Sequence, residues 1–424
     1  MRLAAVRELG APGRLLHVLL GGCEGEHVVA EVCLAAQTLA ERGHLTAAED
    51  VLRQGLRVLQ AGGDLDGDRL IALLGLWVHV ALEQRASLAI DRLLWELPSL
   101  HEADPRVARI EQLLRGALAT LHWTGRALTL MAEVPPFQEP ELELARMEVC
   151  VDASRHVSVD DLGVVLKEGA RVVGLGSPSG RRRLASWLAR RAYARERYDP
   201  SARLRMRAVR GEIWASRRFR ELLRAAINWV EVAEFDRASA CVETVLRELV
   251  PLRLPTLEGD ALWTQRTIAW RRGLCDEVDE ELADLASKVD PRVGRLMLFH
   301  EATLAWAHRN AFLFKRFYDR VVGLAGQNTA LRTLALLEAM AVDLGVYPVA
   351  PALTERRITE LGREVPGIAL QVMALSRGAV APDEAMLRAA RDFAERTRCP
   401  SWHLRLDVLS VSESLARLGV QISR

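Results

Sequence analysis

The feature that most limits how this chain can fold is a sequence pattern that returns every 38 to 40 residues. Three segments share it: DVLRQGLRVL, VVLKEGARVV and TVLRELVPL. Their second residues are Val51, Val165 and Val245, which are 114 and 80 residues apart, or three steps of 38 and two steps of 40. Self-similarity at such a period is typical of proteins built from repeats of one small supersecondary motif.

Short turns divide the chain into these units. They fall near residues 43, 84, 124, 157, 197, 234, 273, 310, 345 and 378. Between the turns, apolar residues recur at i, i+3, i+4 and i+7, the spacing of a helix buried along one face. The stretch 201–218 shows two neighbouring stripes of this kind. The apolar stripe is Ala202, Met206, Val209 and Ile213, and the other stripe is Arg203, Arg207, Arg210 and Trp214.

Each unit is therefore expected to be two helices joined by a tight turn. One such hairpin cannot bury its apolar faces alone, but stacked hairpins bury them continuously. The sequence predicts an all-α fold, a single continuous right-handed α-solenoid of about ten stacked helix-turn-helix hairpins over residues 1–424. Residues 1–24 are expected to form an N-terminal capping helix.

Composition agrees with a helical protein that acts in the cytoplasm. Half of the residues are hydrophobic but only 5% are aromatic, and the formal net charge is +1. The six cysteines are scattered singly, which indicates free thiols in a reducing compartment. No apolar run approaches the ~20 residues that a membrane span needs, so no membrane partner is expected. An apolar stretch ending at Cys23 contains His17, which argues against a secretory signal.

In its turns the chain resembles the tetratricopeptide-repeat superfamily. Residues with the spacing of that superfamily are Leu39, Gly43 and Ala47; then Trp229, Glu234 and Ala238; and, as a poorer match, Trp270, Gly273 and Val278. The repeats are longer than that family's usual 34 residues, and most lack a closing proline. The arrangement is similar to the degenerate helical-repeat regions of bacterial signalling and transcription regulators. The resemblance implies a scaffold or adaptor for protein binding and no particular chemistry.

The stretch GLGSPSGRRR has the look of a phosphate-binding loop at the start of a helix. Its preceding residues VVLKEGARVV match the repeat helix DVLRQGLRVL, whereas a phosphate loop follows a strand. Neither GxxxxGK[ST] nor GxGxxG is satisfied, because Arg181 follows Gly180 and position 179 is a serine. Residues 174–180 are therefore interpreted as a loop between hairpins, with Ser179 as the N-cap of the next helix.

No arrangement of residues indicates catalysis. The segment HEATL at 300 lacks the second histidine of a zinc-protease helix, because position 304 is a leucine. Cys399 and His403 lie close in sequence, but nothing else there indicates a nucleophilic thiol. We expect no catalytic residue, no metal site and no cofactor, and the protein is predicted not to be an enzyme.

One segment of the chain is strongly basic. Residues 181–224 contain fifteen arginines and four acidic residues, with five aromatic residues interleaved. Candidate binding residues are Arg190, Arg191, Arg195, Arg203, Arg207, Arg210 and Trp214. The segment suits an acidic segment of a partner protein, phosphates and bases of a nucleic acid, pairing with acids of this chain such as those in DEVDEELAD at 276, or simple solvation.

The sequence therefore predicts a protein–protein interaction scaffold or adaptor in a bacterial regulatory or signalling assembly. The alternative is a regulator that contacts nucleic acid through residues 181–224. The identity of the partner and the oligomeric state are not indicated by the sequence.

Overall fold

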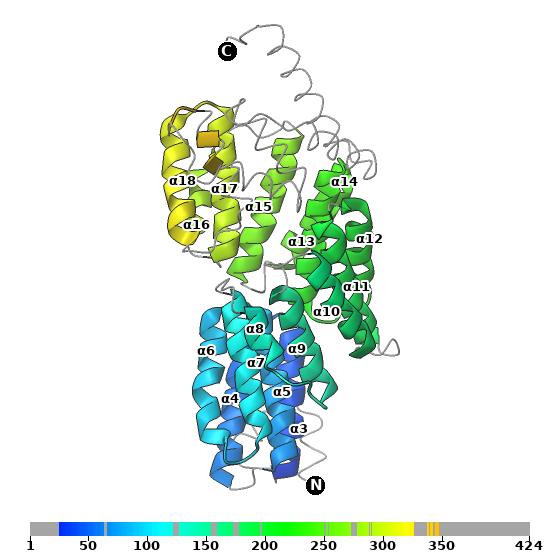
Figure 1. The fold of residues 1–424 in the computed structure, drawn as a ribbon. Coiled ribbons are helices and arrows are strands. Elements are labelled where there is room, and N and C mark those ends of the chain that lie inside the picture. The colour runs from blue at the N-terminus through cyan, green and yellow to red at the C-terminus, as the bar shows by residue number, and fades with distance from the viewer. Residues whose placement is uncertain are drawn as a thin grey trace, which may run out of the picture. The chain divides into compact units, whose positions relative to one another are not determined.

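A computed structural model shows a helical protein (Figure 1). It describes residues 25–62, 66–121, 127–153, 159–172, 178–195, 197–249, 252, 254–272, 278–287, 289, 291–325, 337–338, 340–341 and 344–346. Within these residues every regular element is a helix. The all-α prediction is confirmed.

The chain divides into two compact units. Unit 1 comprises residues 1–187 and 208–220, and unit 2 comprises residues 188–207 and 221–424. Three helices each contain a boundary between the units: α11 (Pro178–Ala194), α12 (Tyr198–Val209) and α13 (Ala215–Glu231). The single continuous solenoid over residues 1–424 stays a prediction, and the predicted capping helix 1–24 lies outside the described residues.

Unit 1 contains the helices from α3 to α10. They are α3 (Gly25–Glu41), α4 (Leu45–Gly62), α5 (Gly67–Gln84), α6 (Ser87–Glu96), the 3-10 turn η1 (Leu97–Leu100), α7 (Arg106–Leu121), α8 (Ala127–Ala132), α9 (Pro140–Ala153) and α10 (Val159–Val172). Helices α3 and α4 pack together, α5 packs against both, and α7 and α9 continue the stack from α5. Leu52, Leu74 and Trp77 are fully buried in the shared core.

Unit 2 contains the helices from α14 to α18. They are α14 (Phe235–Leu249), α15 (Pro255–Arg271), α16 (Glu280–Leu285), α17 (Pro291–Ala307) and α18 (Ala311–Ala325). Helices α14, α15 and α17 pack in succession, and α17 and α18 lie side by side (Figure 1). Met297, Phe314 and Phe317 are fully buried in the core between them.

The helix ends confirm the hairpin prediction. At the first turn the amide of His44 donates to the carbonyl of Leu39, and that of Gly43 donates to Ala40. The same pair of bonds recurs around Ala233 and around Arg309. This is the Schellman motif, in which the residue just after the helix takes a left-handed conformation. The φ angles are 89° at Gly43, 61° at Ala233 and 58° at Arg309.

These turns also correct the register of the predicted repeat. Five residues after each left-handed residue lies a fully buried side chain: Ala48, Ala238 and Phe314. The alignment of the repeats within this sequence instead pairs Ala47 with Ala238, but Ala47 is exposed. The alignment was one residue off because Glu234 was matched to Gly43, whereas the residue equivalent to Gly43 is Ala233.

Residues 178–180 of the loop predicted over residues 174–180 belong to a helix, and residues 174–177 lie outside the described residues. Helix α10 ends at Val172, and α11 already begins at Pro178. Ser179 is therefore inside the helix, and its prediction as an N-cap was wrong. Proline is favoured in the first turn of a helix because its missing N–H would have no helical partner there. The predicted turns near 124, 157, 273 and 378 lie outside the described residues.

Candidate functional site

The arginine-rich segment 181–224 is shared between the two units. Residues 181–187 and 208–220 belong to unit 1, and residues 188–207 and 221–224 belong to unit 2. Its arginines fall into three sets: a buried cluster in unit 1, a second buried cluster in unit 2, and a set of exposed side chains.

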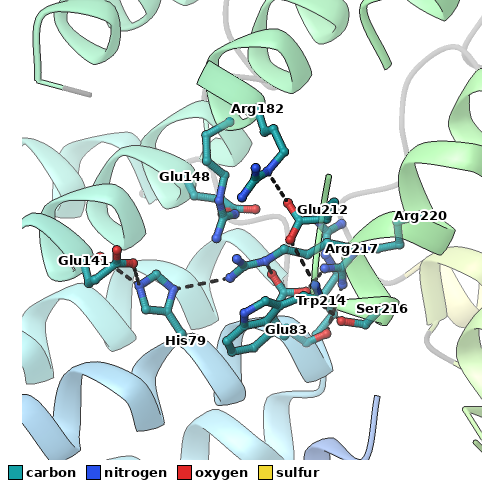
Figure 2. Close-up of polar contacts among 12 residues, drawn as sticks. His79, Glu83, Glu141, Glu148, Arg182, Glu212, Trp214, Ser216, Arg217 and Arg220 are labelled. Carbon is teal, nitrogen blue, oxygen red and sulfur yellow. Dashed lines mark hydrogen bonds and ion pairs between the residues drawn. The ribbon is translucent and has the colours of Figure 1, made fainter. Parts of the chain in front are cut away.

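The unit 1 cluster is centred on Glu83, a buried acid near the end of α5 (Figure 2). Its carboxylate accepts hydrogen bonds from Arg217 and Arg220, and from the Ser216 hydroxyl at 3.2 Å. Arg220 also donates to the Glu83 backbone carbonyl at 3.0 Å. A buried carboxylate requires such partners, because an unpaired charge in the interior is strongly unfavourable. These bonds fasten the start of α13 to α5.

His79, one turn before Glu83, continues the cluster (Figure 2). Its Nε2 lies 2.9 Å from the backbone carbonyl of Glu141, and its Nδ1 lies 3.5 Å from Arg217 Nη2. Because an arginine can only donate, Nδ1 accepts and Nε2 carries the proton, so the ring is neutral. Burial lowers the pKa of His79, and the nearby Arg217 charge lowers that pKa further. Arg217 also stacks on Trp214, with its guanidinium carbon 4.4 Å from the ring centroid.

Two arginines of α11 complete the cluster. Arg183 pairs with Glu148, and Arg182 Nε lies 3.5 Å from Glu212 Oε2. Burial lowers the pKa of Arg183 to about 10, while the Glu148 charge opposes that change.

The unit 1 cluster pairs buried arginines with acids of the chain. The paired acids are Glu83, Glu148 and Glu212, and their partners are Arg182, Arg183, Arg217 and Arg220. The Glu141 side chain, which lies 3.2 Å from His79 Nε2, is 67% exposed. A buried network whose members are paired in this way stabilises one arrangement of the helices around it.

The unit 2 cluster is built on a chain of hydrogen bonds across three helices. The Ser201 hydroxyl on α12 donates to the Ala189 carbonyl on α11 at 2.8 Å. Asn228 on α13 donates to the same hydroxyl oxygen at 2.8 Å. Ser201 and Asn228 are fully or almost fully buried. These hydrogen bonds connect α11, α12 and α13 where the three helices pass Ser201 in unit 2.

Three arginines flank that chain of bonds. Arg190 follows Ala189, Arg205 lies one turn after Ser201, and Arg224 lies one turn before Asn228. Arg205 Nη1 donates to Glu221 Oε2 at 2.8 Å, and Arg224 Nη2 lies 3.7 Å from Asp260 Oδ2 on α15.

A third set of arginines, Arg195, Arg203, Arg207 and Arg210, is exposed to solvent. Of the other predicted binding residues, Arg190 of the unit 2 cluster and its neighbour Arg191 are half-buried. Arg203 forms an ion pair with Asp199 at 3.0 Å, and its side chain is still 69% exposed. Arg207 lies one turn further along α12 and makes no ion pair within the described residues. Arg203 and Arg207, which we call the exposed pair, belong to unit 2, whereas Arg210 belongs to unit 1.

The predicted stripe that joined these arginines to Trp214 was wrong. Helix α12 ends at Val209, and Gly211 has a φ of 74°, a left-handed conformation that glycine adopts readily. Trp214 therefore lies beyond the helix and is buried in the unit 1 core. Ile213, predicted to be buried, is 53% exposed for the same reason.

The sequence analysis predicted only in part which acids pair with the buried arginines. Pairing with acids of this chain was one option for the segment, but the acids that pair with it come from α5, α9, α13, α15 and the turn after α12. A signal for one of them was present in the sequence. His79 and Glu83 interrupt the apolar run LIALLGLWVHVALEQ, and polar groups inside a buried helix need polar partners.

The structure bears on two of the chemistries considered in the sequence, metal binding and a nucleophilic thiol. The described residues contain no group of three or more histidine, cysteine or acidic side chains placed to hold a metal ion. Cys33, Cys150 and Cys241 are free, and burial raises the pKa of each thiol to about 11. Such thiols are poor nucleophiles. Cys399 and His403 lie outside the described residues.

Glu301 of the HEATL segment is fully buried and accepts a hydrogen bond from Arg266 at 2.7 Å, as a polar residue within a repeat helix. Among the described helices, none is both long enough and apolar enough to cross a membrane.

Comparison with known proteins supports the fold. No protein-family model matches the chain, and no curated protein matches it. The crystal structure of a Rap protein complexed with competence and sporulation factor is similar over 92% of this chain and 99% of that one, with a TM-score of 0.50 and 11% identity. The chain has the helical-repeat fold of that Rap protein. The fold predicted from its tetratricopeptide-like repeats is thereby confirmed.

A second solved structure is similar at a lower level. It is the Rap conjugation gene regulator of the plasmid pLS20 in complex with the Phr* peptide. The similarity covers 83% of this chain and 97% of that one, with a TM-score of 0.45 and 9% identity.

Proposed function

We propose that this chain is a regulatory adaptor without enzyme activity, which binds an acidic segment of another protein through the exposed pair Arg203 and Arg207. Helical-repeat folds offer extended surfaces for partners, and the Rap protein of the same fold was solved with a bound factor. A bacterial regulatory assembly in the cytoplasm suits the free thiols of Cys33, Cys150 and Cys241.

The observation that carries this proposal is the uncompensated charge on α12. Two arginines four residues apart on one helix repel each other, and Asp199 offsets only one of them. Neither side chain is needed in the core, because Ala202 of the same helix is fully buried in its place. Each guanidinium presents a planar set of donors that matches a carboxylate.

Nucleic acid remains the second candidate, because an exposed aromatic residue lies near these charges in the sequence. Tyr193 is 40% exposed, and its ring is 5.6 Å from that of Tyr198 in an edge-on arrangement. Exposed rings beside arginines can stack on bases.

Affinity capture from the source cell tests the proposal. The wild-type chain, the Arg203→Glu/Arg207→Glu variant and an Arg247→Glu control would each be used as bait. Arg247 is an exposed arginine of α14 in the same unit. We expect a protein that the wild type and the control retain and the double variant loses, and that binds the purified wild type directly. Retention by all three baits would contradict the proposal.

A further inference from the structure

Helix α6, at the edge of unit 1 (Figure 1), carries the most exposed large apolar side chain of the described residues. Trp95 is 86% exposed, and Leu88, on the same face two turns earlier, is 58% exposed. The opposite face of α6 is packed, since Ala89, Ile90 and Leu93 are buried in the unit 1 core. Leaving a tryptophan ring and a leucine in water is unfavourable, so this outward face gains free energy when another surface covers it.

Two charged residues lie between Leu88 and Trp95 on the outward face of α6. Asp91 is exposed and makes no ion pair within the described residues. Arg92 is 36% exposed, and its Nη1 lies 3.4 Å from Oε2 of Glu49, a fully buried acid of α4. Because a guanidinium group has five N–H donors, Arg92 can hold Glu49 and still donate to a second carboxylate.

The order of these four residues makes the face complementary to itself. If two copies of α6 pack antiparallel about a two-fold axis between residues 91 and 92, Leu88 of each copy meets Trp95 of the other. In the same arrangement Asp91 of each copy meets Arg92 of the other. Every contact therefore occurs twice, as in the symmetric interface of a homodimer with two-fold symmetry.

We infer that the outward face of α6, formed by Leu88, Asp91, Arg92 and Trp95, joins two copies of this chain in a homodimer with antiparallel α6 helices. This inference goes beyond the proposed function, because α6 belongs to unit 1 and the exposed pair belongs to unit 2. A helix of ten residues is smaller than a standard interface of roughly 800 Å² per partner. The dimer is therefore weak and forms at micromolar concentrations of the chain.

The charges of this face favour a second copy over other partners. An acidic segment or a nucleic acid needs a surplus of positive charge, but Asp91 offsets Arg92 here. Helices that lie on membranes have a polar face rich in lysine and arginine, whereas α6 has one arginine against Asp91 and Glu96. A second copy of α6 supplies both an apolar surface for Trp95 and an opposite charge for each charged residue.

Sedimentation equilibrium of the full chain, at roughly 5 to 500 μM, tests the dimer. We expect the wild type to be in equilibrium between monomer and dimer, and Trp95→Ser to weaken association at least about tenfold, because buried tryptophans dominate the affinity of many interfaces. The control is Leu34→Ser, which changes a leucine of α3 in the same unit that is 48% exposed, and it should associate as the wild type does. Circular dichroism checks the helicity of each variant, and Leu88→Ser is a second variant of the same kind.

Asp91→Asn tests how the two helices are oriented. In the antiparallel dimer this change removes two ion pairs and keeps the size of the side chain, so we expect association to weaken about threefold. In a parallel dimer Asp91 would face the same residue of the second copy, and Asp91→Asn would tighten association by removing the repulsion. Tighter association would overturn the antiparallel arrangement.

Three other results would overturn the homodimer. They are a wild type that stays monomeric over the whole concentration range, a dimer that Trp95→Ser leaves unchanged, and equal weakening in Trp95→Ser and Leu34→Ser. If the wild type is monomeric and a captured protein is lost from a Trp95→Ser bait, the face binds a different protein. Arg203→Glu/Arg207→Glu should dimerise as the wild type does, so failure of the proposed function would leave the dimer in place.

Discussion

Glu83 is the buried acid that pairs with two arginines of the unit 1 cluster, Arg217 and Arg220. Changing Glu83→Gln keeps the size of the side chain but leaves Arg217 and Arg220 buried without their acid. Removing one partner of a buried ion pair costs about 3–5 kcal/mol, and we expect a loss of that order in the free energy of unfolding, measured with urea. Glu243→Gln, at an exposed position of α14, should change it by less than about 0.5 kcal/mol. Equal effects would contradict the structure of the cluster.

His79 makes the stability of unit 1 depend on pH. Its pKa is lowered in the folded chain, whereas the unfolded chain binds a proton near pH 6.5. Between these two values the unfolded state holds more protons, so stability falls as the pH drops below about 6.5, by at most about 1.4 kcal/mol per unit. The pKa of Glu141 is also lowered, chiefly by its bond to His79, and its contribution is lost only at lower pH. Urea unfolding from pH 8 to 5 should show this fall, and His79→Gln should flatten it. An unchanged slope in the variant would contradict the neutral, buried ring.

At the scale of helices and turns, substitutions at the left-handed residues of two hairpins should have opposite effects on the free energy of unfolding. Gly43→Ala places a side chain where φ is 89°, and we expect a loss of about 1 kcal/mol in the free energy of unfolding. Ala233→Gly removes the same penalty at a φ of 61° and should be neutral or stabilising, by up to about 1 kcal/mol. Both are measured by urea unfolding. The same sign and size for both changes would show that the two turns are not equivalent.

The positions of helices and turns could be predicted from the sequence better than the contacts that their side chains make. Period and turn chemistry are local, so the hairpins around residues 43, 234 and 310 could be predicted. The end of α12 could have been predicted as well, since Gly211 interrupts the stripe. The division of the arginines could not, because Arg217 meets an acid 134 residues away in Glu83, and only the tertiary fold brings the two together.

At the scale of the whole molecule, buried and exposed arginines of one basic segment are expected to have different roles. Those of the unit 1 cluster pair with acids of the chain and hold helices together, whereas Arg203 and Arg207 are exposed to solvent. Replacing the exposed pair should therefore leave the free energy of unfolding nearly unchanged, within about 0.5 kcal/mol.

The most direct test of this account is the affinity of the captured protein for the purified chain, measured by isothermal titration calorimetry at low salt. For Arg203→Glu/Arg207→Glu we expect the affinity to fall by at least about tenfold, or about 1.4 kcal/mol, with helicity and stability unchanged, while Arg247→Glu binds as the wild type does. Unchanged affinity in the double variant would contradict the account and leave the exposed arginines as a solvated face of the molecule.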